Sequence, residues 1–137
     1  MAATYPLKVL SAYGTFFDGD CIQTVIPCED GTMGILARHE DCIISVVPGP
    51  LRIKRPDGTE LLAVITGGYA AIDSGVLTLI VDTAEYPEDI DERRAQEALQ
   101  RAEEELKRRQ SRVEYEQSKA QMARAMARLK VKHMNQM

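Results

Sequence analysis

The distribution of glycine and proline divides this chain at one point, and it constrains the fold more than any other feature. All nine glycines and all six prolines lie at or before Pro87, and the last fifty residues contain neither. Before Pro87, short apolar runs alternate with turn residues, which is typical of strands. After it, the residues that favour helices dominate (Ala, Glu, Gln, Lys and Arg). The sequence therefore predicts a β part over residues 1–86 and a helical part over residues 87–137.

The two parts also differ in charge. Residues 1–90 carry 5 basic and 13 acidic side chains, a net charge of −8, whereas residues 91–137 carry 12 basic and 8 acidic side chains, a net charge of +4. Eight acids among the bases make the tail poorly suited to a nucleic-acid backbone. No run approaches the roughly 18 apolar residues that a membrane span needs. We therefore expect no nucleic-acid partner and no direct insertion into a membrane.

The β part has the pattern of an antiparallel sandwich. Turn signals recur every eight to twelve residues, and Pro56-Asp57-Gly58 is a hairpin turn in which each residue suits its position. No helix-length segment lies between the apolar runs, which argues against a parallel sheet. The expected strands, nine to ten in all, lie at about 7–12, 15–17, 20–27, 32–36, 42–47, 51–55, 60–66, 68–72 and 76–82.

No motif of a catalytic or metal site is present. The chain lacks a Gly-x-Ser-x-Gly elbow and a Gly-x4-Gly-Lys-Ser/Thr phosphate loop. Cys21, Cys28 and Cys42 lack the close spacing of metal ligands. Gly67-Gly68 is better explained by a tight turn or bulge than by a phosphate cradle. We expect a docking platform that is not an enzyme, with no catalytic residues, no metal and no required cofactor.

Two helices are expected in the tail. Asp89 followed by Glu92 is a start signal for the first, and a capping-box pattern at Ser111–Glu114 is a start signal for the second. Neither Gly nor Pro forces a turn between them, so an antiparallel hairpin and one continuous rod both remain. The first helix has one narrow apolar stripe, which consists of Ala95, Ala98, Leu99, Ala102 and Leu106.

The second helix has two apolar faces. One hairpin partner can cover only one of them, so the other either packs on the β part or is reserved for another protein. The first face contains Val113, Ala120, Ala127 and Val131, and the nearly opposite face contains Tyr115, Met122, Met126 and Leu129.

Four arginines have the phase to converge between the helices. Arg94 and Arg101 lie two turns apart on one flank of the first helix, and Arg124 and Arg128 lie one turn apart beside the small-residue face of the second. If that face packs on the first helix, the four guanidinium groups share one groove. Planar guanidinium forks in this number suit a triphosphate, although a run of arginines is more often a solvated face.

Over nearly its whole length the chain resembles the epsilon subunit of bacterial F-type ATP synthases. The resemblance rests on motifs in a fixed order, which end with the two-helix tail. They are Gly31-Thr32-Met33-Gly34-Ile35-Leu36 with His39, Pro48-Gly49-Pro50-Leu51-Arg52-Ile53, Gly67-Gly68-Tyr69, Val76-Leu77-Thr78-Leu79 and Ala84-Glu85.

The resemblance implies a non-catalytic rotor subunit. In this family a β-sandwich docks on the gamma subunit and rests on the ring of c subunits, in the central stalk that couples proton flow to ATP synthesis. The helical tail either folds against the sandwich as a hairpin or extends towards the alpha/beta catalytic head, where it inhibits ATP hydrolysis. The implied location is the cytoplasmic face of the bacterial cell membrane, as a peripheral part of the complex.

The resemblance also implies a regulatory ATP site in the folded tail. Some members of the family bind ATP through Ile/Leu-Asp-x-x-Arg-Ala, which Ile90-Asp91-Glu92-Arg93-Arg94-Ala95 matches. The implied residues are Glu85, Ile90, Asp91 and Ala95 on the adenine side, and Arg94, Arg101, Arg124 and Arg128 towards the phosphates. The alternative is a passive rotor subunit in which this motif only caps a helix.

Overall fold

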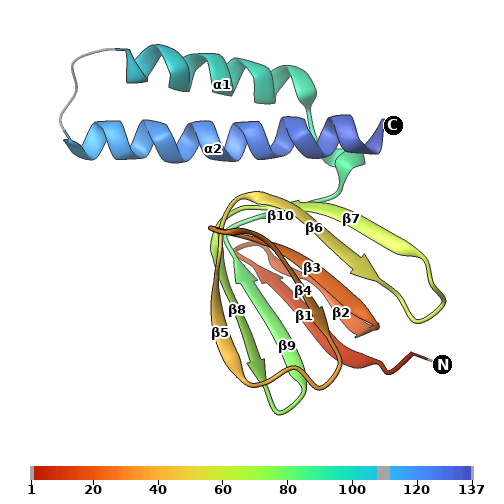
Figure 1. Cartoon of the computed structure of the whole chain (residues 1–137). Coiled ribbons are helices and arrows are strands. Elements are labelled where there is room, and N and C mark those ends of the chain that lie inside the picture. The colour runs from red at the N-terminus through yellow and green to blue at the C-terminus, as the bar shows by residue number, and fades with distance from the viewer. Residues whose placement is uncertain (1, 108–111, 137) are drawn as a thin grey trace.

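The chain folds into a β-sandwich followed by two helices, as predicted (Figure 1). The computed structural model describes residues 2–107 and 112–136. One sheet has the strand order β2-β1-β9-β8-β5, and the other has the order β10-β7-β6-β3-β4. The strands are β1 (Tyr5–Ser11), β2 (Gly14–Cys21), β3 (Gln23–Cys28), β4 (Gly31–Leu36), β5 (Cys42–Val46), β6 (Gly49–Lys54), β7 (Glu60–Ile65), β8 (Gly68–Asp73), β9 (Val76–Val81) and β10 (Ala84–Glu85).

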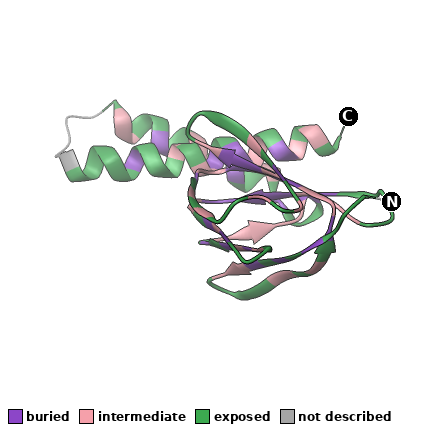
Figure 2. Ribbon diagram, turned by 60° about the horizontal axis from the view of Figure 1, so that its bottom comes forward, coloured by how far each residue is buried: buried purple, intermediate pink, exposed green. Residues whose placement is uncertain are grey.

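The main core lies between the two sheets. Buried and exposed residues occur together along the strands of the sandwich, as its two-sided sheets require (Figure 2). In β1, for example, Leu7 and Val9 are buried and Lys8 is exposed. All fully buried members of this core come from β1–β9. Its one buried phenol, on Tyr5, donates to the Ile35 carbonyl oxygen at 2.8 Å and lies 2.8 Å from Thr24 Oγ1. The sandwich therefore closes its core without the helices.

The structure corrects the predicted boundaries of the second and third strands. We predicted separate strands over 15–17 and 20–27, which leaves a break at Asp18-Gly19. Instead, β2 continues through them to Cys21, and Gly19 pairs with Leu7 of β1. β2 lies at the edge of its sheet. Polar residues are common on edge strands, where one side is open to water, so they do not end this strand.

One strand pair departs from the antiparallel prediction. β1 and β9 are parallel, with Leu7 opposite Leu77. The other pairs among the described strands are antiparallel. Tight turns impose antiparallel pairing only on strands that they join directly. β1 and β9 are far apart in the chain, so the strands between them serve as the long connection that a parallel pair needs.

Gly68 stands at a close approach between two strands. It opens β8 and pairs with Val81 of β9. A Cβ atom on Gly68 would collide with the backbone carbonyl oxygen of Ile80. The close approach of β8 and β9 thus requires a glycine at Gly68.

The N-cap of the first α-helix lies two residues after the predicted start signal at Asp89. A short 3₁₀ turn, η1 (Pro87–Asp89), is followed by α1 (Glu92–Leu106). The N-cap of α1 is Asp91, whose carboxylate accepts from the Arg94 amide at 3.1 Å, and Asp89 belongs to η1. The reason is Ile90, which is extended and buried between the two elements, so the helix cannot include it.

The second helix, α2 (Arg112–Asn135), lies between α1 and the sandwich over its C-terminal half (Figure 1). The predicted N-cap, Ser111, lies outside the described residues. Neither described helix has an apolar stretch long enough to cross a membrane. Because α1 and α2 pack against each other, the two helices form the hairpin and not the continuous rod.

The predicted faces of α2 are only partly correct. Two residues of the small-residue face, Ala127 and Val131, pack on the sandwich. The N-terminal part of this face extends beyond the sandwich, so Val113 is 66% exposed. The side towards α1 includes Ser118, a residue of neither predicted face, which donates to Glu105 of α1 at 3.0 Å. On the opposite face Met126 is 53% exposed, because neither α1 nor the sandwich covers it.

Candidate functional site

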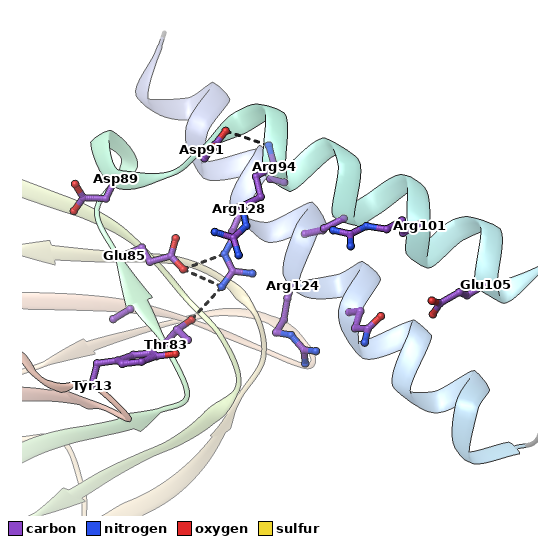
Figure 3. A pocket seen from close by; sticks show the side chains of 15 residues that line it. Tyr13, Thr83, Glu85, Asp89, Asp91, Arg94, Arg101, Glu105, Arg124 and Arg128 are labelled. Carbon is purple, nitrogen blue, oxygen red and sulfur yellow. Dashed lines mark hydrogen bonds and ion pairs between the residues drawn. The ribbon is translucent and has the colours of Figure 1, made fainter.

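A cleft of about 700 Å³ lies where the helical hairpin meets the sandwich (Figure 3). Its walls are the β1–β2 turn, the end of the β part with η1, most of the length of α1 and the middle of α2. Its lining residues are Tyr13, Thr83, Ala84, Glu85, Asp89, Asp91, Arg94, Ala95, Ala98, Arg101, Glu105, Gln121, Arg124, Ala125 and Arg128.

All four predicted arginines line this cleft. Arg94 and Arg101 come from α1, and Arg124 and Arg128 come from α2, so two packed helices bring four guanidinium groups to one space (Figure 3). We predicted this convergence only for the case in which the small-residue face of α2 packs on α1, whereas Ala127 and Val131 of that face contact the sandwich. The arginines converge nevertheless, since they flank that face and the sandwich forms the third wall.

Arg128 is held by Glu85. The arginine donates from Nε at 3.0 Å and from Nη2 at 2.9 Å to the same carboxylate oxygen, Oε1. Arg128 Nη2 also lies 3.4 Å from Thr83 Oγ1. Thr83 is fixed in turn by Thr66, whose hydroxyl accepts from the Thr83 amide at 3.0 Å. The contact is thus built into the sandwich as well as into α2.

The other three arginines differ from Arg128. Within the described part of the chain, none of them forms an ion pair. Arg101 donates from Nε to the Glu97 carbonyl oxygen of its own helix at 3.4 Å. Arg94 uses its backbone amide to complete the N-cap of α1, which leaves its side chain for the cleft. Three guanidinium groups are therefore placed to contact an anion.

Of the remaining predicted site residues, three line the cleft and one lies behind it. Glu85, Asp91 and Ala95 line the cleft, although the Asp91 carboxylate is also the N-cap of α1. Ile90 does not line it, because its side chain is buried in a small cluster with Val64 of β7 and Val131 of α2. Ile90 therefore affects the cleft indirectly, by fixing the segment that joins β10 to α1.

Eight further lining residues were not predicted to belong to the site; three are alanines (Ala84, Ala98 and Ala125), and the other five have polar side chains. Three of these five come from a turn, a loop and η1, where no periodic pattern marks the residues that will face a distant helix. Tyr13, at the β1–β2 turn, is 90% exposed. Glu105 and Gln121 lie on helical flanks beside the arginines, so helical phase could have identified these two. The five are Tyr13, Thr83, Asp89, Glu105 and Gln121.

The electrostatics of the cleft favour an anion in its middle. Four acidic side chains line it beside the four arginines. Asp89 and Glu105 lie at opposite ends, and the arginines lie between them (Figure 3). No group of three or more His, Cys, Asp or Glu that could hold a metal ion occurs among residues 2–107 and 112–136. The arrangement can bind and orient a polyanion through charge-assisted hydrogen bonds.

Comparison with known proteins places both parts of the chain in one family. The profile described as "ATP synthase, Delta/Epsilon chain, beta-sandwich domain" matches residues 4–87, and the profile described as "ATP synthase, Delta/Epsilon chain, long alpha-helix domain" matches residues 88–133. The chain belongs to the ATP synthase delta/epsilon chain family. This confirms the resemblance drawn from the motifs.

The similar members of the family are epsilon chains. The chain is 46% identical to the ATP synthase epsilon chain of Ruminiclostridium cellulolyticum, over 93% of this chain and 94% of that one. It is 38% identical to the epsilon chain of Nitrosococcus oceani, over 73% of this chain and 76% of the relative. It is also 38% identical to an epsilon chain of Acetobacterium woodii described as sodium ion specific, over 72% and 74%.

Two solved structures share the fold. One is a chain of the Euglena gracilis mitochondrial ATP synthase, with a TM-score of 0.80, 22% identity, and coverage of 93% of this chain and 80% of that one. The other is a chain of the Tetrahymena thermophila mitochondrial ATP synthase central stalk and c-ring, with a TM-score of 0.63, 14% identity, and coverage of 93% and 95%. At these identities the likeness concerns the fold.

Proposed function

We propose that this epsilon chain is a non-catalytic rotor subunit of the F-type ATP synthase central stalk whose helical hairpin regulates the enzyme. The subunit helps couple proton flow to ATP synthesis at the cytoplasmic face of the bacterial membrane. The folded hairpin binds ATP as a regulatory ligand. The extended hairpin reaches the alpha/beta catalytic head and inhibits ATP hydrolysis. Family membership and the central-stalk fold neighbour support the first statement, and the cleft supports the regulatory ones.

The observation that carries the nucleotide site is the convergence of the arginines. Arg94, Arg101 and Arg124 line one cleft and, within the described part of the chain, have no ion-pair partner. In the proposed complex they contact the phosphates together with Arg128, and Glu85 and Ala95 lie at the adenine side. Ile90 acts from behind the cleft, by fixing the link between β10 and α1.

The rotor role assigns a second surface to the sandwich. Ile43 of β5, Tyr69 of β8 and Ile80 of β9 are 76%, 61% and 55% exposed. Tyr69 pairs with Ile80, and Ile43 lies on the neighbouring strand, two residues from the partner of Tyr69. The three apolar side chains therefore share one face of a sheet. We assign this face to the gamma subunit, which leaves one end of the sandwich for the c-ring.

One observation favours the passive alternative. The Asp91 carboxylate already accepts from the Arg94 amide as the helix cap, so the motif has a structural use without any ligand. In that case the chain would remain a central-stalk subunit and would not sense nucleotide. The two functions differ in one measurable property, which is ATP binding by the isolated chain.

Titration calorimetry of the purified chain with ATP tests the nucleotide site. Two neighbouring arginines give a matched pair of variants, because Arg94 lines the cleft, whereas Arg93 is 90% exposed and pairs with Glu97 of its own helix. We expect Arg94→Ala to weaken ATP binding at least about tenfold, the loss of a charge-assisted contact, and Arg93→Ala to leave it unchanged. No heat at millimolar ATP, or equal losses in the two variants, would reject the site.

Deletion of residues 88–137 tests the regulation. In the assembled ATP synthase we expect this deletion to raise ATP hydrolysis while the complex still assembles, because the inhibitory segment is gone and the sandwich keeps its own core. The comparison is the hydrolysis rate of the same complex with the full chain. An unchanged rate would leave only the rotor function.

A further inference from the structure

The hairpin is attached to the sandwich by few contacts, and they gather near one point. α2 contacts β6, β7 and η1, and α1 packs mainly on α2 (Figure 1). The apolar part of the attachment is a small cluster in which Ala127 and Val131 of α2 meet Val64 and Ile90. The two residues that α2 contributes are an alanine and a valine, which have small side chains. The apolar contact area that holds α2 on the sandwich is therefore limited.

The polar part of the attachment is the ion pair between Arg128 and Glu85. Its two short hydrogen bonds end on one carboxylate oxygen, and the side chains are only 26% and 28% exposed. Water therefore screens this pair less than a surface pair. Thr83, fixed by Thr66, supports the guanidinium from the sandwich side.

No other ion pair in the described part of the chain joins the hairpin to the sandwich. Arg93 pairs with Glu97 within α1, and His133 of α2 pairs with Glu92 of α1. Lys132 donates to the Pro87 carbonyl oxygen at 3.2 Å, a contact with η1 at the hinge itself. The charges of the hairpin thus mostly stabilise the hairpin, and Arg128 is the one that ties it to a strand.

We infer that the Arg128–Glu85 ion pair is a latch that holds the hairpin on the sandwich before any nucleotide binds. Glu85 ends β10, a strand of two residues that pairs only with Ile65 and Val64, and the chain enters η1 two residues later. The latch therefore lies at the hinge between the two parts. The hairpin cannot leave the sandwich unless this pair separates.

The latch also fits the place of Arg128 in the cleft. A polyanion that contacts this guanidinium offers it a second anionic partner, so the arginine need not lose all charge pairing while the ligand enters or leaves. The existence of the latch does not depend on nucleotide binding, because its partners both belong to the chain. The calorimetric test above and the following test can therefore fail independently.

Hydrogen exchange of the nucleotide-free full chain tests the latch. We expect Arg128→Gln and Glu85→Gln each to speed the exchange of α2 amides about five- to thirtyfold relative to sandwich amides, the effect of losing a contact of moderate strength. Arg124→Gln is the matched control, since it removes a guanidinium one turn away on α2 that lines the same cleft without an ion pair. We expect it to leave the ratio within about twofold of the parent, well below the five- to thirtyfold effect of a lost ion pair.

The double variant Glu85→Gln with Arg128→Gln separates a direct contact from two independent effects. If the side chains act as a pair, the double variant exchanges no faster than the faster single variant. Independent effects would multiply. The latch is rejected if the single variants match Arg124→Gln, if their effects multiply in the double variant, or if sandwich amides accelerate as much as α2 amides.

Discussion

At the scale of single residues, chemically identical side chains take different roles because their surroundings differ. Arg93 and Arg94 are adjacent, yet one faces solvent and the other faces the cleft. Tyr5 and Tyr13 show the same contrast, since Tyr5 is 5% exposed within the core and Tyr13 is 90% exposed at a turn. The consequences for stability can be measured for the tyrosine pair.

Tyr5 gives a prediction that depends on pH. Burial raises the pKa of the Tyr5 hydroxyl well above its ordinary value of about 10, the value expected in the unfolded chain. Below pH 10 both states keep the proton, so the full contribution of the hydroxyl to stability is present. Above pH 10 the unfolded state loses its proton first, so stability falls as pH rises towards the folded-state pKa.

We therefore expect Tyr5→Phe to lower the free energy of unfolding by about 1–2 kcal/mol at pH 8, because the Ile35 carbonyl loses its buried donor. The difference from the parent chain should shrink at pH 10.5. Urea unfolding at the two pH values measures it. Tyr13→Phe is the control and should change neither value. A difference for Tyr5→Phe that is constant with pH would contradict the assigned cause.

At the scale of elements, the start of α1 shows how a helix boundary is decided. Two aspartates near Pro87 both suit an N-cap, and the structure uses Asp91 and leaves Asp89 in η1. Ile90 decides between them, because its side chain is buried in the cluster with Val64 and Val131 while its backbone is extended. The helix can therefore start only after Ile90. A tertiary contact thus selects between two local signals.

Substitution of the two aspartates tests this assignment. We expect Asp91→Ala to destabilise the first turn of α1 by about 1 kcal/mol, since it removes the acceptor for the Arg94 amide. Asp91→Asn should keep most of the protection, because asparagine is also a good N-cap, and Asp89→Ala should have little effect. Hydrogen exchange of the first-turn amides in nucleotide-free protein measures all three. Equal effects of the two alanine variants would show that the cap is misassigned.

At the scale of the whole molecule, the chain has two cores of unequal size. The main core lies wholly within the sandwich, and the second is a small cluster of Val64, Ile90, Ala127 and Val131 at the contact with α2. Phe16 and Tyr86, with ring centroids 4.5 Å apart, fasten the end of the sandwich segment to its core. We therefore expect the sandwich to fold without the hairpin.

A truncated chain of residues 1–87 tests this division. We expect it to unfold cooperatively in urea, with a free energy of unfolding lower than that of the full chain by roughly 2–3 kcal/mol, the order of the value of burying one large aliphatic side chain such as Val64. Near-ultraviolet circular dichroism of the tyrosines follows the transition. Loss of a cooperative transition would show that the helices complete the main core.

The order of elements could be read from the sequence because it rests on local physics. Gly, Pro and alternating apolar residues gave the strands, and their absence after Pro87 gave the helices. The same local signals misplaced a strand break at Asp18-Gly19 and the helix cap at Asp89. Both errors concern residues whose surroundings, an edge strand and a buried isoleucine, are fixed by distant parts of the chain.

The candidate site divides in the same way. Helical phase placed Arg94, Arg101, Arg124 and Arg128 on flanks that could meet, and the cleft contains all four. Which face of α2 turns to the sandwich, and which arginine pairs with Glu85, were decided only by the tertiary structure. The side of a helix on which a residue lies follows from the 3.6-residue period and can be read from the sequence. The contact between Glu85 and Arg128 instead depends on how two separately formed elements pack.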